Sequence, residues 1–229
     1  MLKMMKLDYF SMKPFWIRIF LQALIPFALI LFNVPLFVLP TMAFVMQDAA
    51  FYTFTAEEKG KLHHLYMTLP INRKIIVRTR FVLVLVFLSV GIIFGTALIL
   101  VSSTLLYGRT IIFKYTFNPD FNAILLLISV SLLVCAIVNF ASLPLLLKFG
   151  YSKAKFIGYY LPSYSVMILI SAIIVISYRV EALAKFIFSS IEMAINDIVW
   201  TAVILIGVAV LVFALTYLLS QRVYDKREF

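Results

Sequence analysis

The apolar positions of this chain fall into long blocks that are separated by short polar stretches. A helix needs about 20 apolar residues, at about 1.5 Å rise per residue, to cross a hydrocarbon core about 30 Å thick. Six blocks approach or exceed that length, so the pattern predicts an all-α integral membrane protein with a single transmembrane domain over residues 1–229. The six predicted transmembrane helices are Phe15–Phe32, Pro35–Ala50, Phe81–Leu106, Phe121–Leu147, Phe156–Tyr178 and Val199–Leu219.

Two amphipathic stretches accompany these spans. Met1–Lys13 mixes apolar and charged residues, which predicts an N-terminal helix lying in the membrane interface. Arg179–Asp197, between spans five and six, is too polar to cross a bilayer and too apolar for a solvated loop, so we expect an element pressed into the outer leaflet. Gly91 and Gly95 in span three allow two helices to approach closely, within the chain in preference to a dimer contact.

The stretch Phe54–Phe81 is the most polar part of the chain between two spans. Thr55 and Glu58 have the spacing of a capping box, which predicts that a short helix begins there. Pro70 is expected to end that helix, and Asn72 can cap the next one. The predicted helix is amphipathic, and its apolar face consists of Leu62, Leu65, Tyr66 and Leu69.

A basic cluster follows at the start of the next helix, formed by Arg73, Lys74, Arg78 and Arg80. Cations at a helix N-terminus oppose the helix dipole, so helix stability does not explain them. They suit an anionic membrane surface, where each Lys or Arg contributes about 1 kcal/mol.

Positive charge also predicts the orientation of the spans, since Lys and Arg in short loops stay in the cytoplasm. With the N-terminus inside, sixteen of the 20 Lys and Arg residues lie on the cytoplasmic side and four outside. We therefore expect both termini and the Phe54–Phe81 stretch to be cytoplasmic. The net charge of +10 then needs no nucleic acid to explain it.

An acidic pair, a short amphipathic helix, the run Leu69-Pro70-Ile71-Asn72-Arg73-Lys74, a basic patch and a span follow one another in this order. This order resembles the small permease subunits of bacterial ABC-2 type transporters. The opening Lys6-Leu7-Asp8-Tyr9-Phe10 before Lys13, the span count and the basic tail Gln221–Phe229 fit the same family.

The resemblance implies a bacterial cell-membrane exporter in which two permease chains, identical or different, work with two cytoplasmic ABC ATPase subunits. It implies that the loop between spans two and three is a coupling helix, and that the element before span six is re-entrant. The residues that match the coupling segment are Glu57, Glu58, Leu62, Leu65, Tyr66, Leu69, Pro70, Asn72 and Arg73. ATP and Mg would be bound by the partner, and the cargo would be an amphipathic peptide or lipid-like molecule.

The sequence shows little that would support catalysis by this chain. It has no Gly-x-x-x-x-Gly-Lys-Ser/Thr loop to hold ATP phosphates, so we expect no ATPase activity and no cofactor. His63 and His64 are adjacent and face different sides of a helix, which argues against a metal site. Asp48, at the inner end of span two, is expected to be a solvated or paired interfacial carboxylate, with contact to the coupling segment as the alternative.

Two other functions remain open at this point. An accessory or assembly protein of a membrane complex, such as an immunity factor, would need no transport path of its own. An intramembrane enzyme is a weaker alternative, because the acidic pair Glu57-Glu58 is expected outside the bilayer and no intramembrane histidine follows it to complete a metal site.

Overall fold

The computed structural model describes residues 2–31, 37–59, 73–105, 121–162, 164–165 and 197–226. Every element assigned within these residues is helical, which confirms the predicted all-α class. In chain order they are α1 (Leu2–Ser11), the 3-10 turn η1 (Lys13–Phe15), α2 (Trp16–Leu31), α3 (Val38–Lys59), α5 (Arg73–Leu105), α6 (Phe121–Phe149), α7 (Tyr151–Ala154), the π-helical segment η3 (Lys155–Tyr160) and α10 (Ile198–Asp225).

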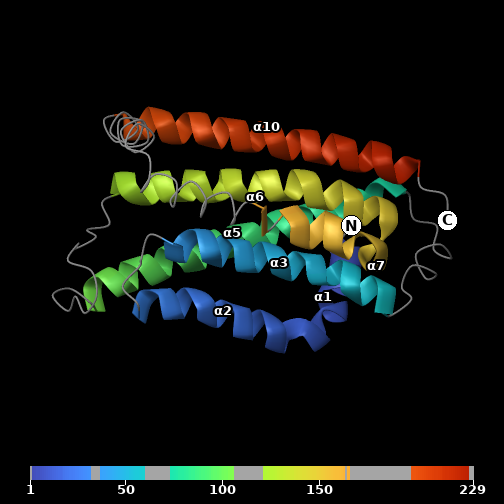
Figure 1. Cartoon of the computed structure of the whole chain (residues 1–229), viewed down its shortest axis with the longest axis horizontal. Helices are drawn as coiled ribbons and strands as arrows, with labels where there is room; N and C mark the ends of the chain where they lie inside the picture. Colours follow the sequence, from blue (N-terminus) through green and yellow to red (C-terminus); the bar gives the residue numbers. More distant parts are fainter. Residues whose placement is uncertain are drawn as a thin grey trace.

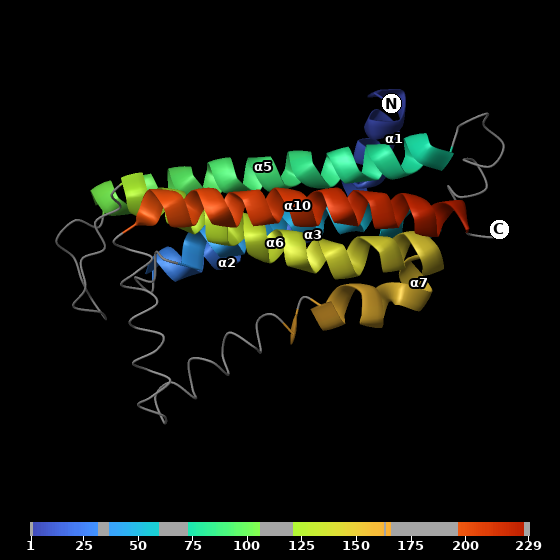
Figure 2. The same cartoon turned by 90° about the horizontal axis from the view of Figure 1, so that it is seen from above.

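The five long helices run alongside one another as an elongated bundle (Figure 1). Helix α10 packs on α6, α3 packs on α5, and α2 packs on the far side of α3. Helices α2 and α3 are antiparallel neighbours. Figure 2 shows that α7 and η3 lie outside this bundle, beside α6.

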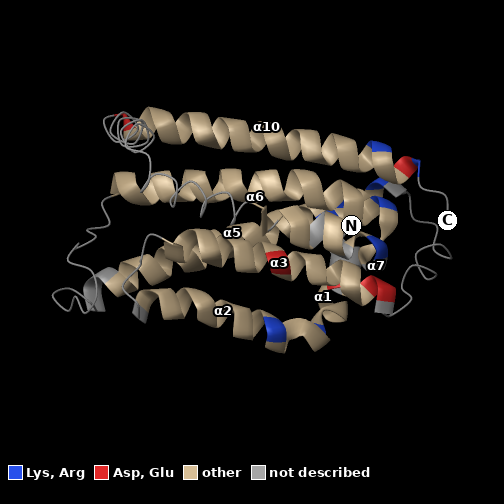
Figure 3. Ribbon diagram, in the orientation of Figure 1, with Lys and Arg blue, Asp and Glu red and all other residues tan. Residues whose placement is uncertain are grey.

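Several helices begin or end at the same end of the bundle. Helices α3, α6 and α10 finish there, α5 begins there, and the short α1 and α7 lie there as well (Figures 1 and 2). We call it the charged end, because the Lys and Arg residues of the described helices lie toward it (Figure 3).

Four helices within the described residues are long and apolar enough to cross a membrane: Lys13–Ile30, Lys74–Ser102, Phe121–Phe149 and Ile198–Asp225. They coincide with predicted spans one, three, four and six. Predicted span two falls in α3, whose composition is too polar for it to be counted with these four. Most of span five lies outside the described residues, as do the outer element up to Ile195 and the loop residues 60–72, so the predicted count of six is not confirmed.

One local prediction is wrong. No helix begins at Thr55, because α3 runs without interruption to Lys59 and the Thr55/Glu58 pattern lies inside it. Tertiary packing of the last turns of α3 overrides the local capping signal. At the other end of the chain, α10 continues to Asp225, and Tyr224 is buried in the core.

Gly91 and Gly95 of α5 face α3 at very short range. A Cβ atom placed on Gly91 would lie 2.9 Å from the Cα atom of Ala43 and 3.0 Å from the carbonyl oxygen of Met42. A Cβ on Gly95 would lie 3.1 Å from the Cα atom of Leu39. The two glycines therefore let the backbones of α3 and α5 approach each other, which larger residues would prevent.

We expect Gly91→Ala to destabilise the fold, by about 1–3 kcal/mol, because the atoms in its way belong to the backbone of α3 and cannot rotate aside. Gly207→Ala in α10 is the matched control, since nothing lies within 4 Å of its added Cβ. That control is expected to be neutral or slightly stabilising, because alanine favours a helix over glycine. Thermal unfolding of both variants in detergent is the measurement, and equal midpoints would contradict the close approach of α3 and α5.

Candidate functional site

The charged end contains a buried ionic network formed by three helices. Arg80 of α5 places its Nη2 atom 3.2 Å from Oδ1 of Asp8 in α1 and 3.2 Å from Oε2 of Glu57 in α3. The Arg80 side chain is 1% exposed, Asp8 is 0% exposed and Glu57 is 16% exposed. The guanidinium of Arg80 also lies over the ring of Phe54, with its Cζ atom 5.1 Å from the ring centroid.

The local sequence explains why an arginine is buried here. Ile76, Val77, Leu83 and Val84 lie three or four positions from Arg80, so they share its face of α5. All four are buried in the core, and Arg80 enters the core with them. Removing a guanidinium from water is costly unless carboxylates and hydrogen bonds compensate, and Asp8 and Glu57 supply that compensation.

This position corrects one prediction. Arg80 is not part of a basic patch on a membrane surface, because the structure buries it among α1, α3 and α5. Lys74 and Arg78 of the same cluster are exposed, which is compatible with a surface role. The helical spacing of Arg80 from four apolar residues was the signal in the sequence that could have separated it from its neighbours.

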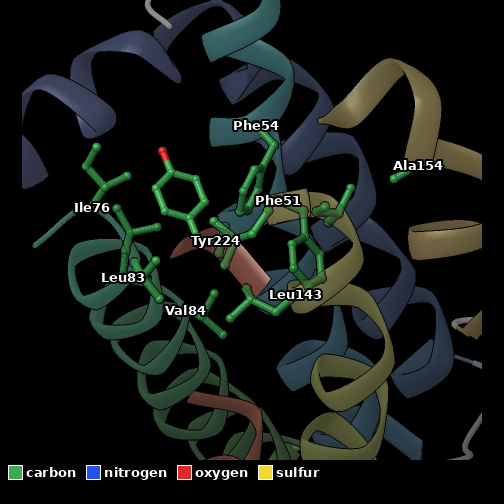
Figure 4. Close-up of a cluster of buried hydrophobic side chains, with 12 residues drawn as sticks. Phe51, Phe54, Ile76, Leu83, Val84, Leu143, Ala154 and Tyr224 are labelled. Atoms are coloured by element: carbon green, nitrogen blue, oxygen red, sulfur yellow. The ribbon is translucent and has the colours of Figure 1, made fainter. Parts of the chain in front are cut away.

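A hydrophobic cluster that includes Phe54 joins α3 and α5 to the rest of the bundle (Figure 4). Phe51 and Phe54 come from α3, Leu143 from α6, and Tyr224 from α10. Ala154 of α7 completes the contact. The end of α3 is thus held by apolar packing as well as by ion pairs, so displacing it would disturb several helices at once.

Some of the residues predicted to couple to an ATPase lie within the described helices, and the others lie outside the described residues. Glu57 and Glu58 lie in the last turn of α3, and Arg73 begins α5. Glu58 is exposed, whereas Glu57 contacts Arg80. Leu62, Leu65, Tyr66, Leu69, Pro70 and Asn72 lie outside the described residues. The structure therefore defines the two helix ends that carry the predicted coupling segment, and it shows that the Asp8–Arg80–Glu57 network connects them.

Asp48 of α3 is buried and not solvated, and its hydrogen-bond partner is a neutral amide and not a cation. Its Oδ2 atom accepts a hydrogen bond from Nε2 of Gln22 in α2, at 2.8 Å. Within the described residues, no group of three or more His, Cys, Asp or Glu side chains is arranged to hold a metal ion.

An all-helical bundle with several membrane-spanning helices, and with its charge gathered at one end, defines a multi-pass membrane protein. Residues 3–225 match the family model described as ABC-2 family transporter protein. The match covers nearly the whole chain, so the protein belongs to the ABC-2 transporter family. No curated protein and no solved structure matches it significantly.

Proposed function

We propose that this chain is the permease subunit of an ABC exporter, driven by ATP that is hydrolysed on separate subunits. The family match supports a membrane component of such a transporter. The observation that carries the proposal further is the Asp8–Arg80–Glu57 network, which binds together both helix ends that flank the predicted coupling segment.

A permease that receives work from an ATPase needs a firm attachment between the coupling segment and its spans. The last turn of α3 and the first turns of α5 are held by the ionic network and by the cluster around Phe51 and Phe54. A push on the segment between them would therefore move α3 and α5 together, since their backbones are also in close contact at Gly91. Two permease chains and two ATPase subunits are the assembly that the family resemblance implies.

The proposed cargo is an amphipathic peptide or a lipid-like molecule moved out of a bacterial cell. It is supported by the apolar and aromatic composition of the chain, which offers few polar groups for a sugar. An accessory or immunity role without transport is the second candidate, since it would use the same membrane fold.

Affinity purification from membranes of the native host tests the proposal. We expect the chain to co-purify with a protein that carries a phosphate-binding Gly-x-x-x-x-Gly-Lys-Ser/Thr loop, and the isolated complex to hydrolyse ATP in a vanadate-sensitive way. Recovery of an intact chain without any such ATPase, under conditions that preserve other ABC complexes, would favour the accessory role.

The proposed orientation places both termini and residues 54–80 in the cytoplasm. Cysteine labelling tests it in a Cys135→Ala background, which removes the one native cysteine of the sequence. We expect Lys61→Cys to react with a membrane-impermeant maleimide only after the cells are permeabilised. Labelling of this position in intact cells, at the rate of an outward control, would reverse the orientation.

A further inference from the structure

A cavity of about 360 Å³ lies between α2, α3 and the α7–η3 segment. It is separate from the Asp8–Arg80–Glu57 network, whose residues do not line it. Its lining combines one carboxylate, one guanidinium, an amide and several tyrosines, from residues that include Arg18, Gln22, Asp48, Tyr52, Tyr160 and Tyr164. A cavity with this mixture is suited to a ligand that carries both charge and apolar surface.

Asp48 is the carboxylate of this cavity, and its hydrogen bonding is incomplete among the described residues. Its side chain is 6% exposed, and its Oδ2 atom accepts the hydrogen bond from Gln22. Its Oδ1 atom is buried without a hydrogen-bond partner among the described residues. Gln22 is itself held by a 3.4 Å contact with the hydroxyl of Tyr52. A carboxylate oxygen buried without a donor is costly, so a ligand with a cationic donor would be favoured there.

Tyrosine rings line the same cavity as the Asp48 carboxylate. Tyr160 and Tyr164 are stacked with centroids 6.0 Å apart, and Tyr52 is stacked on Phe15 at 5.2 Å. Electron-rich ring faces attract cations, most strongly where water is partly excluded. Tyr160 ends a π-helical stretch, a local irregularity that is frequent at functional sites.

Arg18 supplies the opposite charge on the lining of the same cavity. It is exposed, and its guanidinium lies over the ring of Phe15, with Cζ 5.8 Å from the centroid. A guanidinium binds phosphate through paired hydrogen bonds. The cavity therefore offers one anionic and one cationic side chain to a single ligand.

The surroundings of the cavity suit acyl chains. Ile25 of α2 lines it and is 53% exposed. Earlier in α2, Ile17, Phe20, Leu21 and Leu24 are also exposed, and a membrane-spanning helix presents such residues to lipid. A head group in the cavity could thus continue into apolar chains along α2.

From these observations we propose that the cavity binds the head group of a zwitterionic phospholipid with a primary ammonium, of the phosphatidylethanolamine type. Asp48 and the tyrosines receive the ammonium, and Arg18 receives the phosphate. This binding requires only that the chain lies in a membrane, so it stands apart from the proposed partnership with an ATPase.

Native mass spectrometry of the full chain, released from nanodiscs with equal amounts of phosphatidylethanolamine and phosphatidylglycerol, tests the proposal. We expect the wild type to retain phosphatidylethanolamine in preference. Asp48→Asn is expected to reduce that preference about tenfold or more, because it removes a charged partner of the ammonium. Asp197→Asn is the matched control, since Asp197 is exposed, precedes α10 and does not line the cavity.

Arg18→Gln tests the phosphate part of the proposed site separately from the ammonium part. It is expected to weaken retention of both lipids, because both carry a phosphate, whereas Arg222→Gln on the exposed surface of α10 should change neither. Thermal unfolding of each variant identifies any that fails to fold, and Tyr160→Leu then serves as the second variant for the ammonium site, with the same expected loss of preference.

Equal retention of the two lipids by the wild type, or an unchanged preference in Asp48→Asn and Tyr160→Leu, would overturn the proposal. A third arm adds an amphipathic cationic peptide to the nanodiscs. Displacement of the retained lipid by this peptide in the wild type, but not by its acetylated form, would assign the cavity to a peptide ammonium and would overturn the lipid assignment.

Discussion

Arg80→Met is expected to be the most damaging single substitution at the charged end, costing about 3–5 kcal/mol of unfolding free energy. It removes the cation that lies 3.2 Å from both Asp8 and Glu57. Asp8, at 0% exposure, would lose the guanidinium that lies beside its Oδ1 atom, in a site that water does not reach. The variant should unfold at a much lower temperature in detergent, or accumulate poorly in the membrane.

The control for this substitution is Arg78→Met, two residues earlier on the same helix. Arg78 is exposed, so its replacement should change the unfolding free energy by no more than about 0.5 kcal/mol. If both variants unfold at the same temperature, the network does not contribute to stability.

Neutralising all three members of the network shows how much of the stability lost in Arg80→Met comes from a buried unpaired charge and how much from the loss of packing. We expect the triple variant Asp8→Asn, Glu57→Gln, Arg80→Met to recover much of the stability that Arg80→Met alone loses. The reason is that a neutral substitute for a buried ion pair often costs little, whereas one remaining buried charge costs much. A triple variant that folds but no longer couples ATP hydrolysis to transport would show that the network also transmits force from the coupling segment.

The double substitution Leu65→Ala with Tyr66→Ala is expected to abolish recovery of the ATPase while leaving the permease folded. Both residues belong to the apolar face predicted to enter a groove on the ATPase. Desolvated anchors of this kind typically contribute more than about 1 kcal/mol each, and aromatic anchors the most. The pair should therefore weaken the complex by about tenfold or more, and substrate-stimulated ATP hydrolysis should collapse with it.

The measurement is pull-down of the ATPase by wild type and variant at equal membrane abundance. Ile204→Ala with Leu211→Ala in α10 is a matched control, since both residues are largely exposed apolar side chains of a membrane-spanning helix. Unchanged recovery with the Leu65/Tyr66 variant would mean that this face rests on the membrane instead of docking.

The acidic pair should behave differently from the apolar face. Glu58 is exposed, and exposed ion pairs contribute little, so Glu58→Gln should reduce ATPase recovery only slightly. Glu57 lies against Arg80, so Glu57→Gln is expected to lower the stability of the fold before it affects docking.

Much of the architecture could be predicted from the chain alone. Long apolar blocks dictate membrane helices whatever their neighbours are, because a backbone in lipid must satisfy its own hydrogen bonds. Four of the predicted spans coincide with apolar helices of the structure, and the family resemblance carried by the Leu69–Lys74 run is confirmed by the match over residues 3–225. The coupling residues from Leu62 to Asn72 stay a prediction.

What the sequence did not determine depended on contacts between distant residues. A capping box at Thr55 and Glu58 is a local signal for the start of a helix. Phe51 and Phe54 pack against α5, α6 and α10, and this packing stabilises α3 as one continuous helix past Thr55. The Gly91 and Gly95 spacing predicts a close approach and does not name the partner, which the structure gives as α3.

The environment of Arg80 likewise could not be predicted from the sequence alone. Counting Lys and Arg predicts which side of the membrane a loop occupies, because that rule depends only on charge and loop length. Whether one particular arginine is solvated or buried depends on the carboxylates that reach it, and those are Asp8, 72 positions earlier, and Glu57, 23 positions earlier. Only the tertiary structure brings α1, α3 and α5 together, since the free energy that holds a buried charge comes from all three helices at once.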